Sequence, residues 1–387
     1  MRVDVKPELF LWACERAGRS IDSLAQQQSF RKLPVWVSGE ERPTFKQLEK
    51  FAQATYTPFG YFFLPKPPEE SVPIPDLRTV GNQYMGHPSP DLLDIMYICQ
   101  QRQEWYRDFA RSMGEKPLPF VGSESLESDA AEVARNIRQA LGFNLEERRG
   151  MPTWTEALRR FIQQADSFGI MVMVSGIVGS NTRRPLDPQE FRGFALADPL
   201  APLVFINGKD TKAAQMFTLA HELAHIWLGE TALSDVGPVT MPSNKVEVWC
   251  NQVAAELLVP LSALREAYEN GMPLREELDR LARRFKVSTL VILRRLHDAG
   301  KLTRDELWQA YNEELDRLRA MPKGSGGDFY LTLPARVSRR FARALVVSTL
   351  EGQTLHRDAF RLLGFHKHAT FRELGRELGY QLEVVVF

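Results

Sequence analysis

The sequence predicts an α+β fold that is mostly helical, and two observations support this prediction. Apolar residues recur with the helical period through most of the chain, and the pattern changes to short strand-like runs only between 168 and 207. Clusters of proline (62–79) and glycine (322–330) then divide the chain. We expect four parts: an N-terminal helical module at 1–65, a proline-rich linker at 66–89, a central α+β domain at 90–320 and a helical C-terminal segment at 321–387.

Composition is that of an ordinary soluble globular protein. Of the 387 residues, 44% are apolar and 25% are charged, and 49 basic residues balance 49 acidic ones. This balance excludes a global field that would draw the whole molecule to nucleic acid or to a membrane surface. Cys14, Cys99 and Cys250 are widely spaced, which argues against a disulfide framework. No run approaches the roughly 20 apolar residues of a membrane span, so we expect a cytoplasmic protein that has no membrane partner.

The N-terminal module contains the helix caps and turn residues that are typical of a small helical bundle. Ser20 or Asp22 can cap a second helix, and Gly39 and Pro43 can mark the turn between the third helix and the fourth. The stretch 19–64 resembles the helix-turn-helix of phage-repressor-type (XRE-like) regulators. In that fold the third helix would enter the major groove of DNA.

The charges of this module leave its partner open. Residues 1–50 hold nine Lys or Arg and seven Asp or Glu, a small basic excess for a nucleic-acid surface. Pro34 interrupts the expected recognition helix. The candidates for DNA contacts are Gln26, Gln28, Arg31 and Lys32. Binding to DNA and docking to a protein both remain open, because a fold alone does not settle function.

The central domain combines strand-like runs with a helix that carries two histidines. The runs are GIMVMVSG, FRGFALAD and PLVFING. They are followed by TLAHELAHIWLGE (218–230), which is helical by period and which Gly229 can end. His221 and His225 are four residues apart, so their imidazoles lie on one helix face about 6 Å apart and can both bind one Zn²⁺. Glu222 is placed to reach a metal-bound water rather than the metal. The alternative is a buried helix with two hydrogen-bonded core histidines.

A zinc site of this kind needs a third protein ligand, and the next expected helix offers two carboxylates. This helix, VEVWCNQVAAELLVP (246–260), contains Glu247 and Glu256. They are roughly two and a half turns apart and point to opposite faces, so at most one serves the metal. We choose Glu247, because Asn251 lies one turn later on the same face and can orient a ligand. Glu256 is then expected in an ordinary surface role, and the alternative for Glu247 is a solvated glutamate near a helix N-terminus.

The two helices together resemble the ImmA/IrrE family of zinc metallopeptidases. The family pattern is H-E-x-x-H, followed by a Glu-x-x-x-Asn helix that ends in Ala-Ala-Glu-Leu-Leu-x-Pro, and the likeness covers the central domain from about 150 to 300. The departure from the pattern is Trp249-Cys250, where many members carry a polar residue and alanine, and we expect this cysteine to be a small buried residue. The resemblance implies a minimal zincin-like fold with these roles: zinc ligands His221, His225 and Glu247, and catalytic base Glu222.

The resemblance also implies a protein substrate, namely a transcriptional repressor or an antitoxin-like regulator in phage, mobile-element, toxin-antitoxin or stress regulation. Glu222 would take a proton from a zinc-activated water and deliver it to the leaving amine. An extended substrate would add beside the strand PLVFING. Two other classes of function remain open: a DNA-binding regulator with a non-proteolytic zinc site, and a sensor that sequesters a partner without cleaving it. Structural zinc sites usually have four protein ligands, which favours catalysis.

The rest of the chain offers few candidates for chemistry. His366 and His368 lie near a loop and lack a third ligand. His297 is a candidate oxyanion donor, against the plainer alternative of a surface histidine. Four arginines recur at spacings of three and four in the C-terminal segment, and we expect a solvated stripe rather than a nucleic-acid surface: Arg336, Arg339, Arg340 and Arg343.

Overall fold

The computed structural model of the protein describes residues 1–77, 79–80, 83–84, 88–234, 244–320 and 334–380. The fold is mostly helical with one small mixed sheet, so the predicted α+β class is confirmed. The chain forms two compact units, Met1–Pro73 with Met85–Met96, and Ile74–Tyr84 with Tyr97–Phe387. The four-part division stays a prediction, and the glycine-rich break at 322–330 lies outside the described residues. Among the helices that are described, none has the length and apolar character that a bilayer span requires.

The first unit is a helical bundle around an aromatic core. Phe10 packs against the rings of Trp36, Phe51 and Phe62, with ring centroids 5.4–6.1 Å apart. Tilted and edge-on rings at these distances are the arrangement that aromatic side chains favour. The elements of this unit are α1 (Pro7–Arg16), α2 (Ile21–Ala25), η1 (Gln28–Phe30), α3 (Leu33–Val37), α4 (Phe45–Ala54) and η2 (Phe59–Phe63).

Side chains cap two helices of this bundle, one of which the sequence predicted. Ser20, rather than Asp22, caps α2, because its hydroxyl accepts a hydrogen bond from the Ser23 amide at 3.1 Å. Thr44 and Gln47 form a reciprocal capping box at the start of α4. These caps explain why α2 and α4 begin where they do. DNA binding by the bundle stays a prediction.

Pro34 shortens the third helix as expected. The helical stretch divides into η1 and α3, and Pro34 stands in the first turn of α3, where its missing N–H costs no helical hydrogen bond. The four predicted contact residues are exposed on this part of the bundle: Gln26, Gln28, Arg31 and Lys32. Lys32 forms an ion pair with Glu41 at 2.8 Å, which reduces the basic surface available to DNA.

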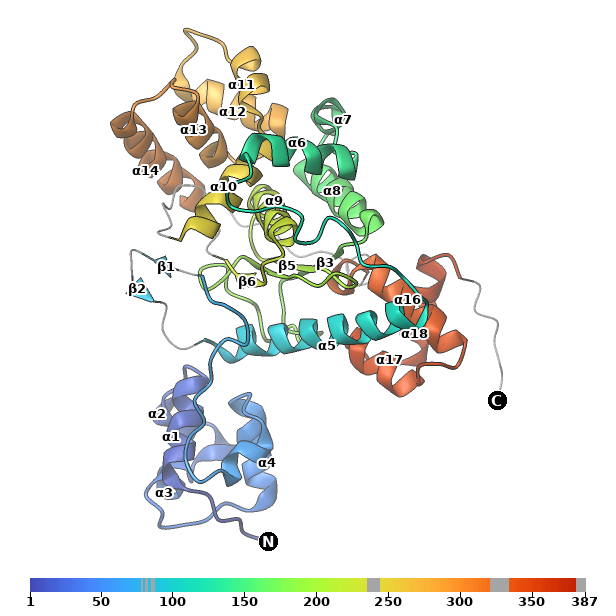
Figure 1. Ribbon diagram of the computed structural model, residues 1–387. Coiled ribbons are helices and arrows are strands. Elements are labelled where there is room, and N and C mark those ends of the chain that lie inside the picture. Colours follow the sequence, from blue (N-terminus) through green and yellow to red (C-terminus); the bar gives the residue numbers. More distant parts are fainter. Residues whose placement is uncertain (78, 81–82, 85–87, 235–243, 321–333, 381–387) are drawn as a thin grey trace. The chain divides into compact units, whose positions relative to one another are not determined.

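The second unit contains the sheet and most of the helices (Figure 1). Helix α5 (Pro90–Ser112) begins in the first unit and continues into the second. The strands are β1 (Thr79–Val80), β2 (Gln83–Tyr84), β3 (Met171–Ser175), β4 (Gly193–Leu196), β5 (Leu203–Asn207) and β6 (Ala232–Leu233). The helices are α6 (Ala130–Leu141), α7 (Leu145–Gly150), α8 (Trp154–Phe168), α9 (Lys212–Leu228), α10 (Lys245–Leu258), α11 (Leu261–Ala267), α12 (Leu274–Phe285), α13 (Thr289–Asp298), α14 (Arg304–Ala320), α16 (Arg339–Leu350), α17 (His356–Leu363) and α18 (His368–Glu377).

The main sheet has the strand order β3-β5-β4-β6. Strands β3 and β5 are parallel, and β4 is antiparallel to both β5 and β6. Helix α9 packs on β4 and β5, and α8 and α10 pack against α9 (Figure 1). The PLVFING run is β5, and the prediction that a substrate adds beside it is wrong, because both edges of β5 are already paired.

The C-terminal helices do not present the expected solvated arginine stripe. Asp166, at the end of α8, accepts hydrogen bonds from the Ser338 hydroxyl at 2.6 Å and from the Arg340 amide at 2.9 Å. The Arg340 guanidinium lies over the Tyr106 ring, 5.6 Å from its centroid. Arg343 is exposed, whereas Arg336 and Arg339 are half-buried. The solvated interpretation is therefore wrong for Arg340, because tertiary packing uses this side of α16.

Candidate metal centre

Helix α9 holds the H-E-x-x-H motif in the interior of the second unit. The Thr211 hydroxyl caps its first turn by accepting from the Ala214 amide at 3.2 Å. Gly229 ends it, as predicted, with a φ of 73° that favours glycine. Between these ends almost every residue is buried, and His221, Glu222 and His225 are fully buried. Polar side chains buried this deeply need partners, so their contacts indicate their role.

Helix α10 places Glu247 beside α9. The Asn244 side chain caps its start, and Glu247 follows in the first turn, fully buried. At the other end, arginines from three different helices bind the terminal carbonyl groups. Arg138 donates to Glu256 O at 2.6 Å, Arg148 donates to Leu258 O, and Arg295 donates to Val259 O at 2.9 Å. Cations at a helix C-terminus satisfy its free carbonyls and interact favourably with its dipole.

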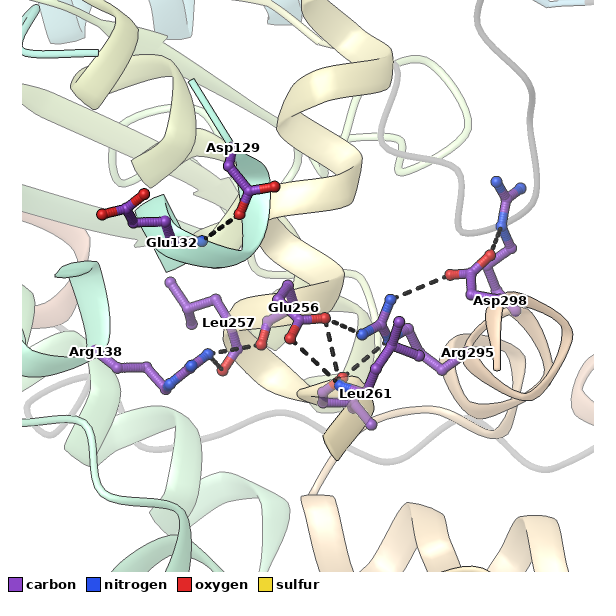
Figure 2. A network of polar contacts seen from close by, with 10 residues as sticks. Asp129, Glu132, Arg138, Glu256, Leu257, Leu261, Arg295 and Asp298 are labelled. Atoms are coloured by element: carbon purple, nitrogen blue, oxygen red, sulfur yellow. Dashed lines mark hydrogen bonds and ion pairs between the residues drawn. The ribbon is translucent and has the colours of Figure 1, made fainter. Parts of the chain in front are cut away.

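Glu256 belongs to this structural end of α10 rather than to the solvated surface, so its expected surface role is wrong. Its carboxylate accepts from the Leu261 amide at 3.3 Å and pairs with Arg295, and its side chain is 14% exposed. Figure 2 shows Arg138 and Arg295 reaching the end of α10 from two sides. The two glutamates of α10 thus have separate tasks, as their opposite helix faces predicted.

Three side chains converge at the start of α10 with their donor atoms together. The Nε2 atoms of His221 and His225 are 3.1 Å apart. Glu247 Oε1 lies 3.2 Å from His225 Nε2, and Glu247 Oε2 lies 3.4 Å from His221 Nε2. The ligand atoms of this group all lie within 4.8 Å of one another, and all three residues are buried. Two imidazole nitrogens and one carboxylate, with a second carboxylate nearby, are a donor set that catalytic zinc sites use.

Asn251 orients the first of these histidines. Its Oδ1 atom lies 3.0 Å from His221 Nδ1. An amide oxygen can only accept, so His221 Nδ1 donates and Nε2 keeps its lone pair for a metal. We expected Asn251 to orient a metal ligand, and the candidate ligand that it contacts is His221.

Polar atoms without hydrogen-bond partners point to a bound cation. Among the described residues, buried atoms that lack a hydrogen bond include Glu247 Oε2 and Glu222 Oε1. A buried carboxylate oxygen without a hydrogen bond is costly, and a metal ion or a water bound to it removes this cost. The residues present therefore fit a divalent metal.

The two carboxyl groups of the site differ in acidity. Burial alone would raise the pKa of Glu247, but the adjacent His221 and His225 outweigh it and lower that pKa to about 2. Burial raises the pKa of Glu222 to about 8, although His221 opposes the rise. Glu247 is therefore the anion suited to binding a cation, whereas burial favours the protonated form of Glu222.

Sequence reasoning missed Ser234, which lies directly after β6 and is 1% exposed. Its hydroxyl oxygen is 3.1 Å from His225 Nε2 and donates to Glu222 Oε2 at 3.3 Å. A serine nine residues after a histidine carries no recognisable signal, because a short strand and its pairing with β4 bring it back to α9.

Gly193 is a second residue whose importance the sequence did not indicate. A Cβ atom at this first residue of β4 would lie 2.5 Å from Thr218 Cγ2, 2.8 Å from Phe205 O and 3.1 Å from Glu222 Oε1. The close approach of β4 to α9 that sets the position of Glu222 thus requires glycine.

We expect Gly193→Ala to reduce the free energy of unfolding by about 1–3 kcal/mol, because the added methyl group meets a strand carbonyl that cannot yield easily. Gly150→Ala is the matched control, since a Cβ atom there meets nothing within 4 Å. Urea denaturation followed by circular dichroism measures both. Equal midpoints for the two variants would show that β4 can move away from α9.

The other predicted residues are not among the three side chains that converge here. His297 is in the last turn of α13 and is 30% exposed, and its Nδ1 atom lies 3.8 Å from Asp298 Oδ1. His366 and His368 are exposed. Cys250 is fully buried, as expected, and burial raises the pKa of its thiol. Its neighbour Trp249 donates its indole N–H to Ser128 O at 2.9 Å.

Comparison with known proteins shows that the part of the chain that holds the candidate metal centre is similar to a family of peptidases. Residues 165–297 match a peptidase M78 family model described as the IrrE N-terminal-like domain, and residues 337–377 match a domain of unknown function (DUF8813). The chain is similar to the radiation response metalloprotease IrrE of Deinococcus radiodurans, with 35% identity over 96 residues. This stretch covers 24% of the chain and 29% of the relative, so the match spans less than a third of that protein's length. No solved structure matches.

Proposed function

We propose, on the premise that residues 165–297 belong to the ImmA/IrrE family of metallopeptidases, that this chain is a zinc-dependent endopeptidase. The observation that carries the proposal is the convergence of His221 Nε2, His225 Nε2 and the Glu247 carboxylate, with Glu222 beside them. Three protein ligands leave a coordination position open for water, whereas structural zinc sites are usually closed by four.

Each side chain has a distinct task in this proposal. His221, His225 and Glu247 would hold zinc, which supplies a Lewis acid that makes water nucleophilic near neutral pH and polarises a peptide carbonyl. Glu222 takes the proton of the attacking water and then delivers it to the leaving amine. Ser234, which donates to Glu222 Oε2, holds that carboxylate in place.

The substrate we propose is a regulatory protein, either a transcriptional repressor or an antitoxin-like regulator. This proposal follows from the family and from the helical bundle at 1–65, which resembles a repressor-type DNA-binding module. That bundle would bind DNA or the partner protein through its exposed Gln26, Gln28 and Arg31.

The proposal is tested by incubating the purified chain with the repressor encoded beside its gene. We expect the zinc-loaded protein to cut the repressor, the chelated protein to be inactive, and added zinc to restore cleavage, because the metal is part of the reaction. Gel electrophoresis and mass spectrometry of the fragments measure the result. Cleavage that survives complete removal of the metal would overturn the proposal.

The second candidate is a sensor that sequesters its partner without cutting it. The observation in its favour is the burial of the whole centre, since His221, Glu222 and His225 are 0% exposed. A sequestering protein would release the repressor from DNA and leave it intact, whether or not zinc is present. Electrophoretic mobility shift beside the cleavage assay distinguishes the two candidates.

A further inference from the structure

The outer edge of the main sheet lies next to the metal centre. Strand β6 is the last strand, and its other edge is paired to β4. Both backbone groups of Leu233 that face away from β4 are engaged by the segment 74–77. The Leu233 amide donates to Pro75 O at 2.9 Å, and the Leu77 amide donates to Leu233 O at 2.9 Å. Asp76 therefore pairs with Leu233 in a parallel bridge.

The paired residue of this edge, Leu233, is next in sequence to a residue of the candidate metal centre. Ser234 follows Leu233, and its hydroxyl contacts both His225 and Glu222. An extended polypeptide needs a free strand edge to add main-chain hydrogen bonds to a sheet. The described edge of β6 offers none, because Leu233 is already paired on that side.

The burial of the centre agrees with a closed edge. His221, Glu222, His225 and Glu247 are all 0% exposed, so a peptide bond cannot reach them unless something moves. On the side of β6 opposite β4, the segment 74–77 pairs with Leu233, the residue directly before Ser234.

The sequence of residues 74–77 favours an extended strand that pairs with β6 over a short length and can therefore be displaced. Ile74 precedes Pro75, and a residue before proline is biased toward extended backbone, so the segment is preset as a strand. Pro75 has no N–H, so the ladder cannot continue from it toward Thr231. One bridge with two hydrogen bonds is a short pairing, and a longer peptide strand would make more of them.

We propose that the outer edge of β6 is the binding site for an extended polypeptide segment, and that residues 74–77 of this chain occupy it as a displaceable internal strand. The incoming segment binds by backbone hydrogen bonds to Leu233 after the internal strand leaves. That this segment is the substrate rests on the proposed peptidase function, whereas the exchange of strands does not depend on it.

The test uses zinc-loaded full-length protein and two variants of one residue. Leu77→Pro removes the amide that donates to Leu233 O, and Leu77→Ala removes the side chain but keeps that amide. The probe is a fluorescein-labelled peptide with the sequence of residues 71–79, SVPIPDLRT. Its control is the same peptide with proline in place of the leucine.

We expect Leu77→Pro to bind the probe about fivefold to tenfold more tightly than Leu77→Ala or wild type, which is the effect of losing one backbone hydrogen bond that competes with it. Fluorescence polarisation measures the affinity. Hydrogen–deuterium exchange of the peptide that contains Leu233 should be faster in Leu77→Pro and should slow again when the probe is added. The proline-containing probe should not restore protection.

The inference is overturned if Leu77→Pro and Leu77→Ala match in probe affinity and in exchange at Leu233. If Leu77→Pro does not fold, Ile74→Ala replaces it, because Ile74 is the buried anchor of the segment at 8% exposure, and the same two measurements apply. Neither measurement requires catalysis. Strand exchange without cleavage of any repressor would therefore refute the peptidase function alone, and cleavage by wild type without strand exchange would refute this inference alone.

Discussion

Glu222→Gln should retain zinc and lose cleavage activity. The Glu222 carboxylate is not one of the three converging groups proposed to bind zinc, so glutamine should preserve the metal site and the fold. Glutamine cannot take a proton from water, and loss of a general base typically reduces a rate by about 10² to 10⁴. Cleavage of the adjacent repressor by the wild type and the variant, with zinc measured on the same samples, gives the comparison.

The matched control for this experiment is Glu230→Gln. Glu230 follows the same helix and is exposed, so the same change of charge there should leave cleavage unchanged. Binding of the repressor should survive in Glu222→Gln and last longer, because the complex no longer turns over. If Glu222→Gln and wild type release the repressor from DNA equally well and neither cuts it, the sequestering sensor is the correct function.

The sequence predicted the local features of the centre because they depend on spacing along single helices. His221 and His225 share a helix face by their four-residue separation, and Asn251 shares a face with Glu247 for the same reason. Caps such as Ser20 and the helix end at Gly229 follow from local hydrogen bonding and from backbone freedom.

The rest of the centre could not be predicted because it depends on contacts between distant segments. Ser234 reaches Glu222 through the pairing of β6 with β4, and Gly193 is required by the approach of β4 to α9. The strand order, which places β5 inside the sheet, is likewise a property of tertiary pairing. Apolar runs identify strands but do not say which strand lies at an edge.

The same distinction explains Glu256. Its helix face predicted that it would not join Glu247, and this is what the structure shows. Its partner Arg295 comes from α13, 39 residues later, so no local pattern could indicate that Glu256 fixes the end of α10. The carboxylate that the sequence left on the surface is thus part of the framework that holds Glu247 in place.

Removal of a ligand should abolish zinc binding, whereas removal of Glu256 should not. We expect about one zinc per wild-type chain and less than about one-tenth in His221→Ala and Glu247→Ala, because two remaining ligands hold the ion weakly. Glu256→Ala should keep the zinc and lose about 1–3 kcal/mol of folding free energy, because it removes one of the two carboxylates that pair with the Arg295 guanidinium, whose side chain is 5% exposed. Elemental analysis after dialysis measures the metal, and urea denaturation of the zinc-loaded proteins measures stability. Zinc that is retained in Glu247→Ala and lost in Glu256→Ala would show that the third ligand is Glu256. The convergence of Glu247 with the two histidines would then not form the zinc site.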